Sequence, residues 1–243
     1  MYLRENMKNS KINTAIEKIN TINTSQEKIF STFQDICHDF NIDSFALAVF
    51  AGKQSLIDSF CLHCTYPKEW ISHYQNNQYH LYDPVFGALQ KAAAPFEWST
   101  HSFKNLLPIQ QQLMNEAYEF GIKFGETIPL IPHPTFHGFV TIINQPSLHP
   151  EALYMLSFAA NMCANKLTYI RNTQAIKLLT ERETEILIQK SEGVAVKTIS
   201  HNLGISQATI TFHLKNIRKK LSAQSTEHAL LKFTSPKQPS SIY

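Results

Sequence analysis

The chain has 243 residues, 43% of them hydrophobic, and a formal net charge of +3. This length suits one large or two ordinary domains, and no apolar run approaches the roughly 20 residues that span a bilayer. The N-terminus is polar, with no apolar segment typical of a signal peptide, and the four cysteines are irregularly placed. We therefore expect a cytoplasmic protein with no membrane contact, in a reducing compartment.

The first two thirds of the chain predict an α+β domain, an α/β/α sandwich around an antiparallel sheet. Helices are indicated by apolar residues at three- and four-residue spacing, and strands by short β-branched or aromatic runs. In chain order we expect a helix over Ser25–Phe40, strands over Phe45–Ala51 and Ser55–Phe60 joined as a hairpin, helices over Pro67–Gln78, from Asp83-Pro84 and over Lys104–Gly121, strands over Thr127–Ile131 and Phe136–Ile143, and a long helix over Leu148–Arg171.

The remainder predicts an all-α four-helix domain. Thr180 followed by Glu183 forms a capping box, the pattern that opens a helix. Further helices are predicted over Ala195–Asn202, over Ser206–Leu221 and from Ser225. The chain should therefore comprise a flexible extension at 1–24, the α+β domain at 25–171, a linker at 172–179, the four-helix domain at 180–233 and a disordered tail at 234–243.

The segment "ISHNLGISQATITFHLKNIRKKL", residues 199–221, has the spacing of a helix-turn-helix. Gly204 can adopt a positive φ in the tight turn. The apolar stripe that buries the last helix comprises Ile210, Leu214, Ile217 and Leu221. The other faces carry Gln207, Thr209, Thr211, Lys215 and Arg218, and a recognition helix presents such residues to bases and phosphates. From these residues alone, a generic helical hairpin with a solvated basic end at Arg218–Lys220 stays open.

Together with "LTERETEIL" before it, this segment resembles the DNA-binding domain of LuxR-type transcriptional regulators. The matching positions are Glu183, Leu187, Gly193, Ile199, Leu203, Ile205, Ser206, Thr209, Ile210, His213, Asn216, Lys220 and Leu221. The resemblance implies that the partner is double-stranded promoter DNA. The implied contacts are Ser206, Gln207, Thr209, Thr211, Lys215 and Arg218. The chain departs from the family at Gly193-Val194-Ala195, where Gly-Lys-Thr is usual, and Thr211 lacks the bidentate fork with which Arg reads a base.

The first domain carries "TYPKEWISHYQNNQYHLYDPVF", residues 65–86, which resembles the pocket motif of acyl-homoserine-lactone receptors, a common input domain of LuxR-type quorum-sensing regulators. The matched pocket positions are Tyr66, Trp70, Tyr74, Asp83, Trp98 and the glycine Gly125. The resemblance extends over about residues 26–233, and it implies a homodimer. An autoinducer is then the effector ligand, and no further cofactor is implied.

The resemblance also implies a partner for each polar atom of the ligand, because an unpaired buried polar atom costs ~1–3 kcal/mol. Trp70 donates to the lactone carbonyl, Asp83 accepts the amide N–H, Tyr66 with Thr141 as helper donates to the amide carbonyl, Trp98 packs on the lactone ring, and Tyr74 lines the acyl chain. Without the resemblance, an aromatic stripe at helical spacing is more often a core face. Asp83 is also an N-cap in its own right, and a carboxylate can serve both roles.

Other functions lack their sequence signals. The alternation of strands and helices that a phosphoacceptor receiver needs is missing. No nucleophile elbow, zinc-protease, P-loop or dinucleotide motif indicates an enzyme. Cys61 and Cys64 form a single C-x-x-C without a second ligand pair, so we expect small packing residues at a strand end and no metal site. His73, His80, His133 and His137 look incidental. A LuxR-type regulator that binds another small molecule, or none, remains the alternative.

Overall fold

The computed structural model describes Thr14, Glu17, Lys18 and residues 25–51, 59–131, 136–145 and 147–234. The chain divides into two compact units between Asn165 and Lys166. Each unit has its own hydrophobic core. The predicted N-terminal extension and C-terminal tail lie almost wholly outside the described residues. None of the described helices is both long and apolar enough to cross a lipid bilayer.

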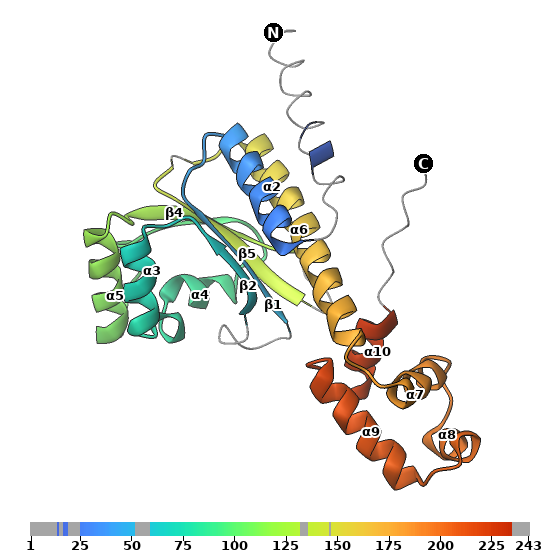
Figure 1. Cartoon of the computed structure of the whole chain (residues 1–243). Coiled ribbons are helices and arrows are strands. Elements are labelled where there is room, and N and C mark those ends of the chain that lie inside the picture. Colours follow the sequence, from blue (N-terminus) through green and yellow to red (C-terminus); the bar gives the residue numbers. More distant parts are fainter. Residues whose placement is uncertain are drawn as a thin grey trace. The chain divides into compact units, whose positions relative to one another are not determined.

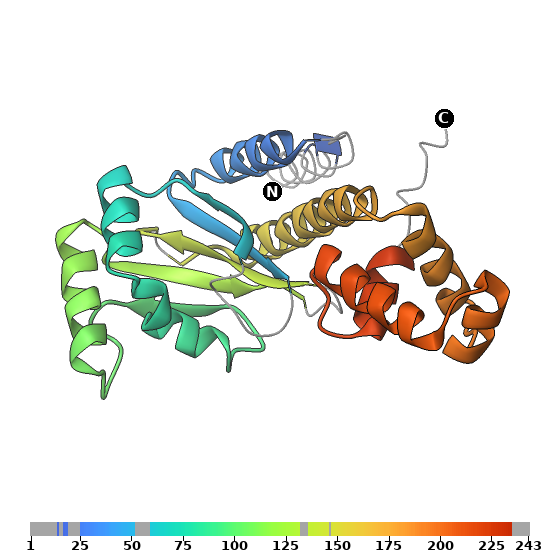
Figure 2. The same cartoon turned by 60° about the horizontal axis from the view of Figure 1, so that its bottom comes forward.

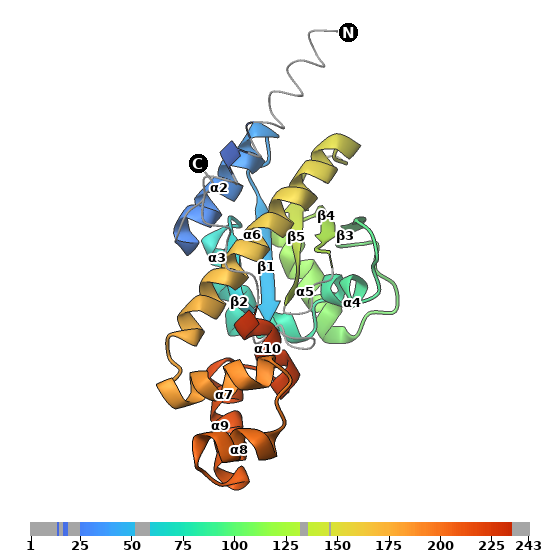
Figure 3. The same cartoon turned by 90° about the vertical axis from the view of Figure 1, so that its right-hand side faces the viewer.

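The first unit is a three-layer sandwich (Figures 1 and 3). Its strands are β1 (Phe45–Ala51), β2 (Ser59–Cys64), β3 (Phe96–Ser99), β4 (Phe124–Pro129) and β5 (Phe136–Ile143), and its helices are α2 (Gln26–Asp39), α3 (Lys68–Asn76), α4 (Pro84–Leu89), α5 (Pro108–Glu119) and the first part of α6 (Pro150–Ile176). The strands pair in the order β2-β1-β5-β4-β3, always antiparallel. Helices α2 and α6 cover one face of the sheet, and α3, α4 and α5 cover the other. The predicted α/β/α sandwich is confirmed.

Residue size alternates along strand β1, which lies between β2 and β5. Leu47 and Val49 are fully buried and point to the face covered by α2 and α6. Ala46, Ala48 and Phe50 point to the opposite face, because successive side chains of a strand alternate. Two alanines in place of large side chains leave space between the sheet and the layer formed by α3, α4 and α5.

Two predicted strands needed correction. The second strand is Ser59–Cys64 rather than Ser55–Phe60, and it pairs with β1 through Cys64 opposite Ala46. Residues 55–58 of the predicted strand lie outside the described residues. The strand predicted over Thr127–Ile131 begins earlier, at Phe124, because the segment that pairs with β3 includes Gly125, a residue that strand propensity disfavours.

The sequence patterns missed two short elements and misplaced one helix end. Strand β3 and the 3-10 turn η2 (Tyr79–Leu81) span four and three residues, too few to carry a recognisable period. Helix α6 ends at Ile176 rather than at Arg171. Ala175 and Ile176 pack against the hydrophobic core of the second unit, so the polar residues before them are helical.

The second unit is the predicted bundle of four helices (Figure 2). These are α7 (Glu181–Ser191), α8 (Val196–Leu203), α9 (Gln207–Lys220) and α10 (Thr226–Thr234). The capping box forms as expected: Thr180 Oγ1 accepts from the Glu183 N–H at 3.2 Å, and the Glu183 carboxylate accepts from the Thr180 N–H at 2.8 Å. Gly204 takes φ +64° between α8 and α9, and Ser206 caps α9. The predicted apolar stripe of α9 lies in the core.

Candidate functional site

A cavity of about 350 Å³ lies in the first unit between the sheet and α3, α4 and α5. Its volume falls within the range of small-molecule sites, and most of its lining is apolar, as in such sites. All six predicted pocket residues line it: Tyr66, Trp70, Tyr74, Asp83, Trp98 and Thr141. The structure therefore brings together side chains from α3, β3, β5 and the segments that precede α3 and α4, which are up to 75 positions apart in the chain.

The aromatic stripe is only partly helical. Trp70 and Tyr74 lie one turn apart on α3, whereas Tyr66 precedes the helix, which begins at Lys68. The helical spacing of the three residues therefore does not mean that they share one helix face, because the proline before Lys68 marks the helix start. The Tyr66 hydroxyl lies 3.5 Å from the backbone carbonyl of Thr141. That is a long, weak contact, so the hydroxyl is available to a better acceptor.

Asp83 holds two hydrogen bonds and remains able to accept more. Its Oδ1 accepts from the Val85 N–H at 2.8 Å and so caps α4, and its Oδ2 accepts from the Tyr74 hydroxyl at 2.9 Å. Burial raises the pKa of Asp83 from 3.8 to about 6, against the lowering effect of these two bonds. The carboxylate is therefore mostly ionised at neutral pH, and each oxygen keeps a free lone pair. Tyr74, expected only as an apolar wall, also orients Asp83.

A chain of hydroxyls gives Thr141 a free proton. The Trp98 indole N–H donates to Thr127 Oγ1 at 3.0 Å, and Thr127 Oγ1 lies 2.9 Å from Thr141 Oγ1. Thr127 is fully buried, and Thr141 is the one acceptor its proton reaches among the described residues. Thr127 must therefore donate to Thr141, which leaves the Thr141 hydroxyl free to donate into the cavity. No local sequence pattern indicates Thr127, because its partner depends on strand register.

Gly125 makes room for Trp98. A Cβ on Gly125 would lie 2.8 Å from Trp98 Cζ2 and 2.5 Å from the Ile142 carbonyl oxygen. The indole therefore lies directly against the backbone of β4, with one edge bonded to Thr127. The glycine at this position is explained by close approach of a ring and a carbonyl, not by backbone conformation.

Trp70 is 5% exposed, and its ring packs against Tyr74 and Phe120 at centroid distances of 5.7 and 5.5 Å. Its indole N–H has no hydrogen-bond partner among the described residues. The Trp70 side chain lines the cavity, and a donor in such apolar surroundings normally has a partner, so the N–H indicates where a ligand acceptor belongs.

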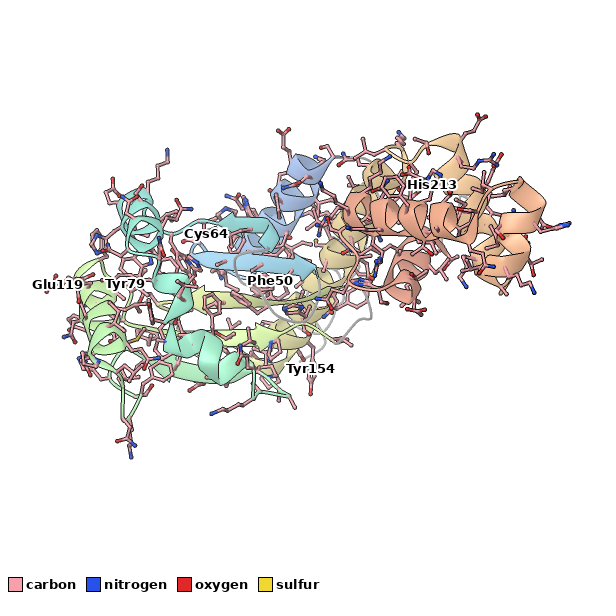
Figure 4. The ribbon with its side chains drawn as sticks, turned by 90° about the horizontal axis from the view of Figure 1, so that it is seen from below. Phe50, Cys64, Tyr79, Glu119, Tyr154 and His213 are labelled. Carbon is pink, nitrogen blue, oxygen red and sulfur yellow. The ribbon has the colours of Figure 1, made fainter. Side chains whose placement is uncertain are left out.

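A polar network behind Trp70 ties α3 to α5. His73 Nε2 lies 2.7 Å from Glu116 Oε2, and the Tyr79 hydroxyl donates to the same carboxylate. Gln112 donates to the other oxygen at 2.8 Å. Figure 4 labels Tyr79 beside α5. His73, which looked incidental in the sequence, therefore helps to hold the wall that carries Trp70.

The described thiol and imidazole groups at the cavity do not form an activated nucleophile or a metal site. Cys64 ends β2 and lines the cavity, and burial raises the pKa of its thiol to about 11, so it has little thiolate character. His80 also lines the cavity, and His137 stacks on Phe50 at 5.1 Å. His133 lies outside the described residues. Within the described part of the chain, no three His, Cys, Asp or Glu side chains come together as a metal site.

The second candidate site is α9. Gln207, Thr211 and Lys215 are exposed on it, and Arg218 is half-buried. Ser206 and Thr209 bond to each other and form the helix start: Ser206 Oγ accepts from the Thr209 N–H at 3.0 Å. All six predicted contact residues thus lie on α9 or at its first turn.

Two features of α9 were not predicted. Phe212, which follows Thr211, is 60% exposed. No sequence pattern indicated a role for it. Lys220, expected in the basic end, instead bonds Glu183 at 2.7 Å. Burial of Glu183 would raise its pKa, but Lys220 and the capping bonds at Thr180 lower it overall. Lys220 therefore holds the bundle together, because an acid as buried as Glu183 needs a charged partner.

The turn before α8 carries Gly193-Val194-Ala195 where the family usually has Gly-Lys-Thr, and α8 lacks a capping side chain as a result. Ala195 is the N-cap of α8 and makes no side-chain capping bond.

At the other end of the unit, Lys232 Nζ donates to the carbonyls of Leu221 and Ser222 at 2.9 and 2.8 Å. Burial lowers the pKa of Lys232 to about 8. The C-terminus of α9 is thus capped by a side chain from α10.

Comparison with known proteins matches the chain to two families in succession. Residues 25–166 match the autoinducer binding domain, and residues 177–233 match the bacterial regulatory proteins of the luxR family. The transcriptional activator protein LuxR of Aliivibrio fischeri is 26% identical over 242 residues, which cover 93% of this chain and 95% of that protein. The HTH-type quorum-sensing regulator RhlR of Pseudomonas aeruginosa is 29% identical over 170 residues, covering 67% and 69%. The crystal structure of Escherichia coli SdiA has the same fold, with a TM-score of 0.60 at 22% identity over 93% of this chain and 96% of that one.

Proposed function

Because this chain belongs to the LuxR family of quorum-sensing transcriptional regulators, with an autoinducer-binding domain and a LuxR-type helix-turn-helix, we propose that its autoinducer is an N-acyl-homoserine lactone. The observation that carries the proposal is the set of polar groups around one apolar cavity. It comprises one ionised acceptor, an unpartnered indole N–H and two hydroxyl donors.

Each group has a counterpart in the lactone. Asp83 accepts the amide N–H, and Trp70 donates to the lactone carbonyl. Thr141, freed by Thr127, donates to the amide carbonyl together with Tyr66. Trp98 lies against the lactone ring, and the apolar remainder of the cavity takes the acyl chain. Every buried polar atom of the ligand is then paired, which avoids a penalty of ~1–3 kcal/mol for each unpaired atom.

The same groups favour binding over catalysis. Hydrolysis of the lactone needs an activated nucleophile beside a general base. The thiol in the cavity, Cys64, has a raised pKa, and Asp83 is engaged by Tyr74 and Val85. We therefore propose a receptor that releases its ligand unchanged.

For the DNA-binding domain, we propose that α9 enters the major groove. Gln207 and Thr211 then face base edges, Lys215 and Arg218 reach phosphates, and Ser206 and Thr209 place the first turn against the backbone. The exposed ring of Phe212 suits contact with a thymine methyl group. Two copies of the chain would read a pseudo-palindromic site with half-sites about one helical turn apart.

Calorimetric titration of the full-length protein with acyl-homoserine lactones tests the ligand assignment. The matched control is the ring-opened acyl-homoserine with the same chain, which places a second carboxylate near Asp83. We expect the lactone to bind and the ring-opened form not to bind. If neither form of any chain length binds, or both bind equally, the lactone assignment is wrong and a regulator with another ligand, or none, is favoured.

A further inference from the structure

Residues of two separate hydrophobic clusters contribute to the lining of the cavity. One contains Trp70 and Trp98 and takes the ligand's polar head in the function proposed above. The other contains Phe50 and Phe139, with Phe86 packed against them; these three phenylalanines are called the aromatic wall. The ring of Phe139 lies 5.9 Å from that of Phe50 and 5.2 Å from that of Phe86. The wall is therefore a packed cluster that lines this end of the cavity.

Between the two clusters, strand β1 presents small side chains to the cavity. Thr141, at the polar end, pairs with Ala46 on β1, and Phe139 pairs with Ala48. Phe50 follows two residues later on the same face. Figure 4 labels Phe50 on β1 and Cys64, the partner of Ala46, on the neighbouring strand β2. An acyl chain that leaves the polar end along β1 thus passes two alanines and meets Phe50.

The strand sets the length of this path. From Ala46 to Phe50 is four residues, or roughly 13 Å at about 3.4 Å per residue. Contact with the Phe50 ring takes up about 4 Å, which leaves roughly 9 to 10 Å for the chain. Carbon–carbon bonds of about 1.5 Å in an extended chain advance it by roughly 1.25 Å each. The path therefore holds about eight carbons.

We infer that this receptor selects acyl chains of up to about eight carbons and rejects chains of twelve or more, with the aromatic wall as the stop. The inference rests on the proposed function, because it takes the lactone head to lie at the polar end. Phe50 and Phe139 are 3% and 4% exposed, so the wall has little free space to yield.

One edge of the cavity is lined by exposed residues, and it does not offer longer chains an advantage. Leu62 on the edge strand β2 is 51% exposed, and Gln75 on α3 is also exposed, yet both line the cavity. A chain that turns out between them places its last methylenes in water. Those methylenes gain no burial, while the bend adds strain.

Titration of the full-length protein with lactones that carry butanoyl, hexanoyl, octanoyl, dodecanoyl and tetradecanoyl chains tests the inference. Each buried methylene should tighten binding about four-fold, so affinity should rise from butanoyl to octanoyl. Dodecanoyl should bind at least ten-fold more weakly than octanoyl. Dodecanoyl or tetradecanoyl binding more tightly than octanoyl overturns the length limit but leaves the lactone assignment standing. Failure of every lactone overturns both.

Two variants test the wall itself. Phe86→Ala opens the wall at its half-buried member, and it should improve dodecanoyl binding relative to octanoyl by at least ten-fold. Phe103→Ala is the matched control, because Phe103 is a half-buried ring on the other cluster that does not line the cavity. It should leave the ratio unchanged. If Phe86→Ala does not fold, Phe139→Leu makes a smaller opening in the same wall. An unchanged ratio in a folded wall variant overturns the inference.

Discussion

Replacing Asp83 by Asn should make the ligand-free protein more stable and lower its affinity for the ligand. Asn is nearly isosteric and caps helices as well as Asp does, so the Val85 N–H keeps its acceptor. The variant loses the negative charge, however, and its amide N–H₂ presents donors where the carboxylate presented only acceptors. A ligand amide N–H would then face a donor.

The magnitude follows from the pKa of Asp83, which burial raises from 3.8 to about 6. A shift of about two units corresponds to about 3 kcal/mol between the two protonation states. Because the folded state binds the proton more tightly, this contribution to stability is full below about pH 4 and is lost as the pH rises through about 6. The neutral Asn escapes that loss, but its N–H₂ group replaces the oxygen that accepts from the Tyr74 hydroxyl, so we expect a gain smaller than the full shift, about 1–2 kcal/mol at pH 7. The missing charge-assisted bond should weaken the ligand by roughly ten- to hundred-fold.

Urea unfolding from pH 4 to pH 8 measures the first effect, because both tryptophans, Trp70 and Trp98, lie in the first unit and report its unfolding by fluorescence. Other titrating groups affect parent and Asp83→Asn alike, so the difference between the two curves isolates Asp83. It should widen as the pH rises from about 4 to about 7. Parallel curves would refute the buried-charge argument, and unchanged affinity for the octanoyl lactone would remove Asp83 from the site.

Three further predictions concern other parts of the chain. Thr127→Val removes the hydroxyl that donates to Thr141 and should lower the affinity for the lactone about ten-fold in calorimetry. Thr127→Ser keeps a hydroxyl and should bind the lactone like the parent; equal losses in both variants would exclude a role for the Thr127 hydroxyl in orienting Thr141. Lys215→Ala and Arg218→Ala should each weaken DNA binding for all sequences and flatten its salt dependence by about one unit, whereas Lys91→Ala, in the first unit, should not; parent-like binding at several salt concentrations would mean that the recognition face is misplaced. Ala195→Thr should supply the missing cap of α8 and raise the unfolding free energy of the second unit by about 1 kcal/mol; an unchanged urea midpoint would contradict this.

The second unit could be predicted closely because local signals determine it. A capping box, a glycine at positive φ and a serine cap each act within a few residues of where they occur, and the apolar stripe of α9 has a clear period. The prediction failed at Lys220, which looked like part of a basic end. Its partner Glu183 is 37 positions away, and no local pattern reports a contact at that separation.

The first unit was harder to predict because its site depends on strand register. The resemblance to the receptor pocket motif implied that Trp70, Tyr74 and Asp83 share one cavity, and all three line it. Thr127 and the aromatic wall only acquire meaning once β4, β5 and β1 are aligned. A shift of one residue in that register would turn every side chain to the other face, so composition and period alone do not identify them.

The central claim is that a lactone carbonyl accepts the indole N–H of Trp70, and its most direct test uses the two tryptophans of the chain. In ¹⁵N-labelled protein each gives one indole N–H resonance, and Trp70→Phe assigns them. Saturating octanoyl-homoserine lactone should move the Trp70 resonance downfield, because a donor without a protein partner gains an acceptor, while the Trp98 resonance, already bonded to Thr127, should move less. A Trp70 resonance that stays in place with bound lactone, or that moves equally with the ring-opened acyl-homoserine, would contradict the account.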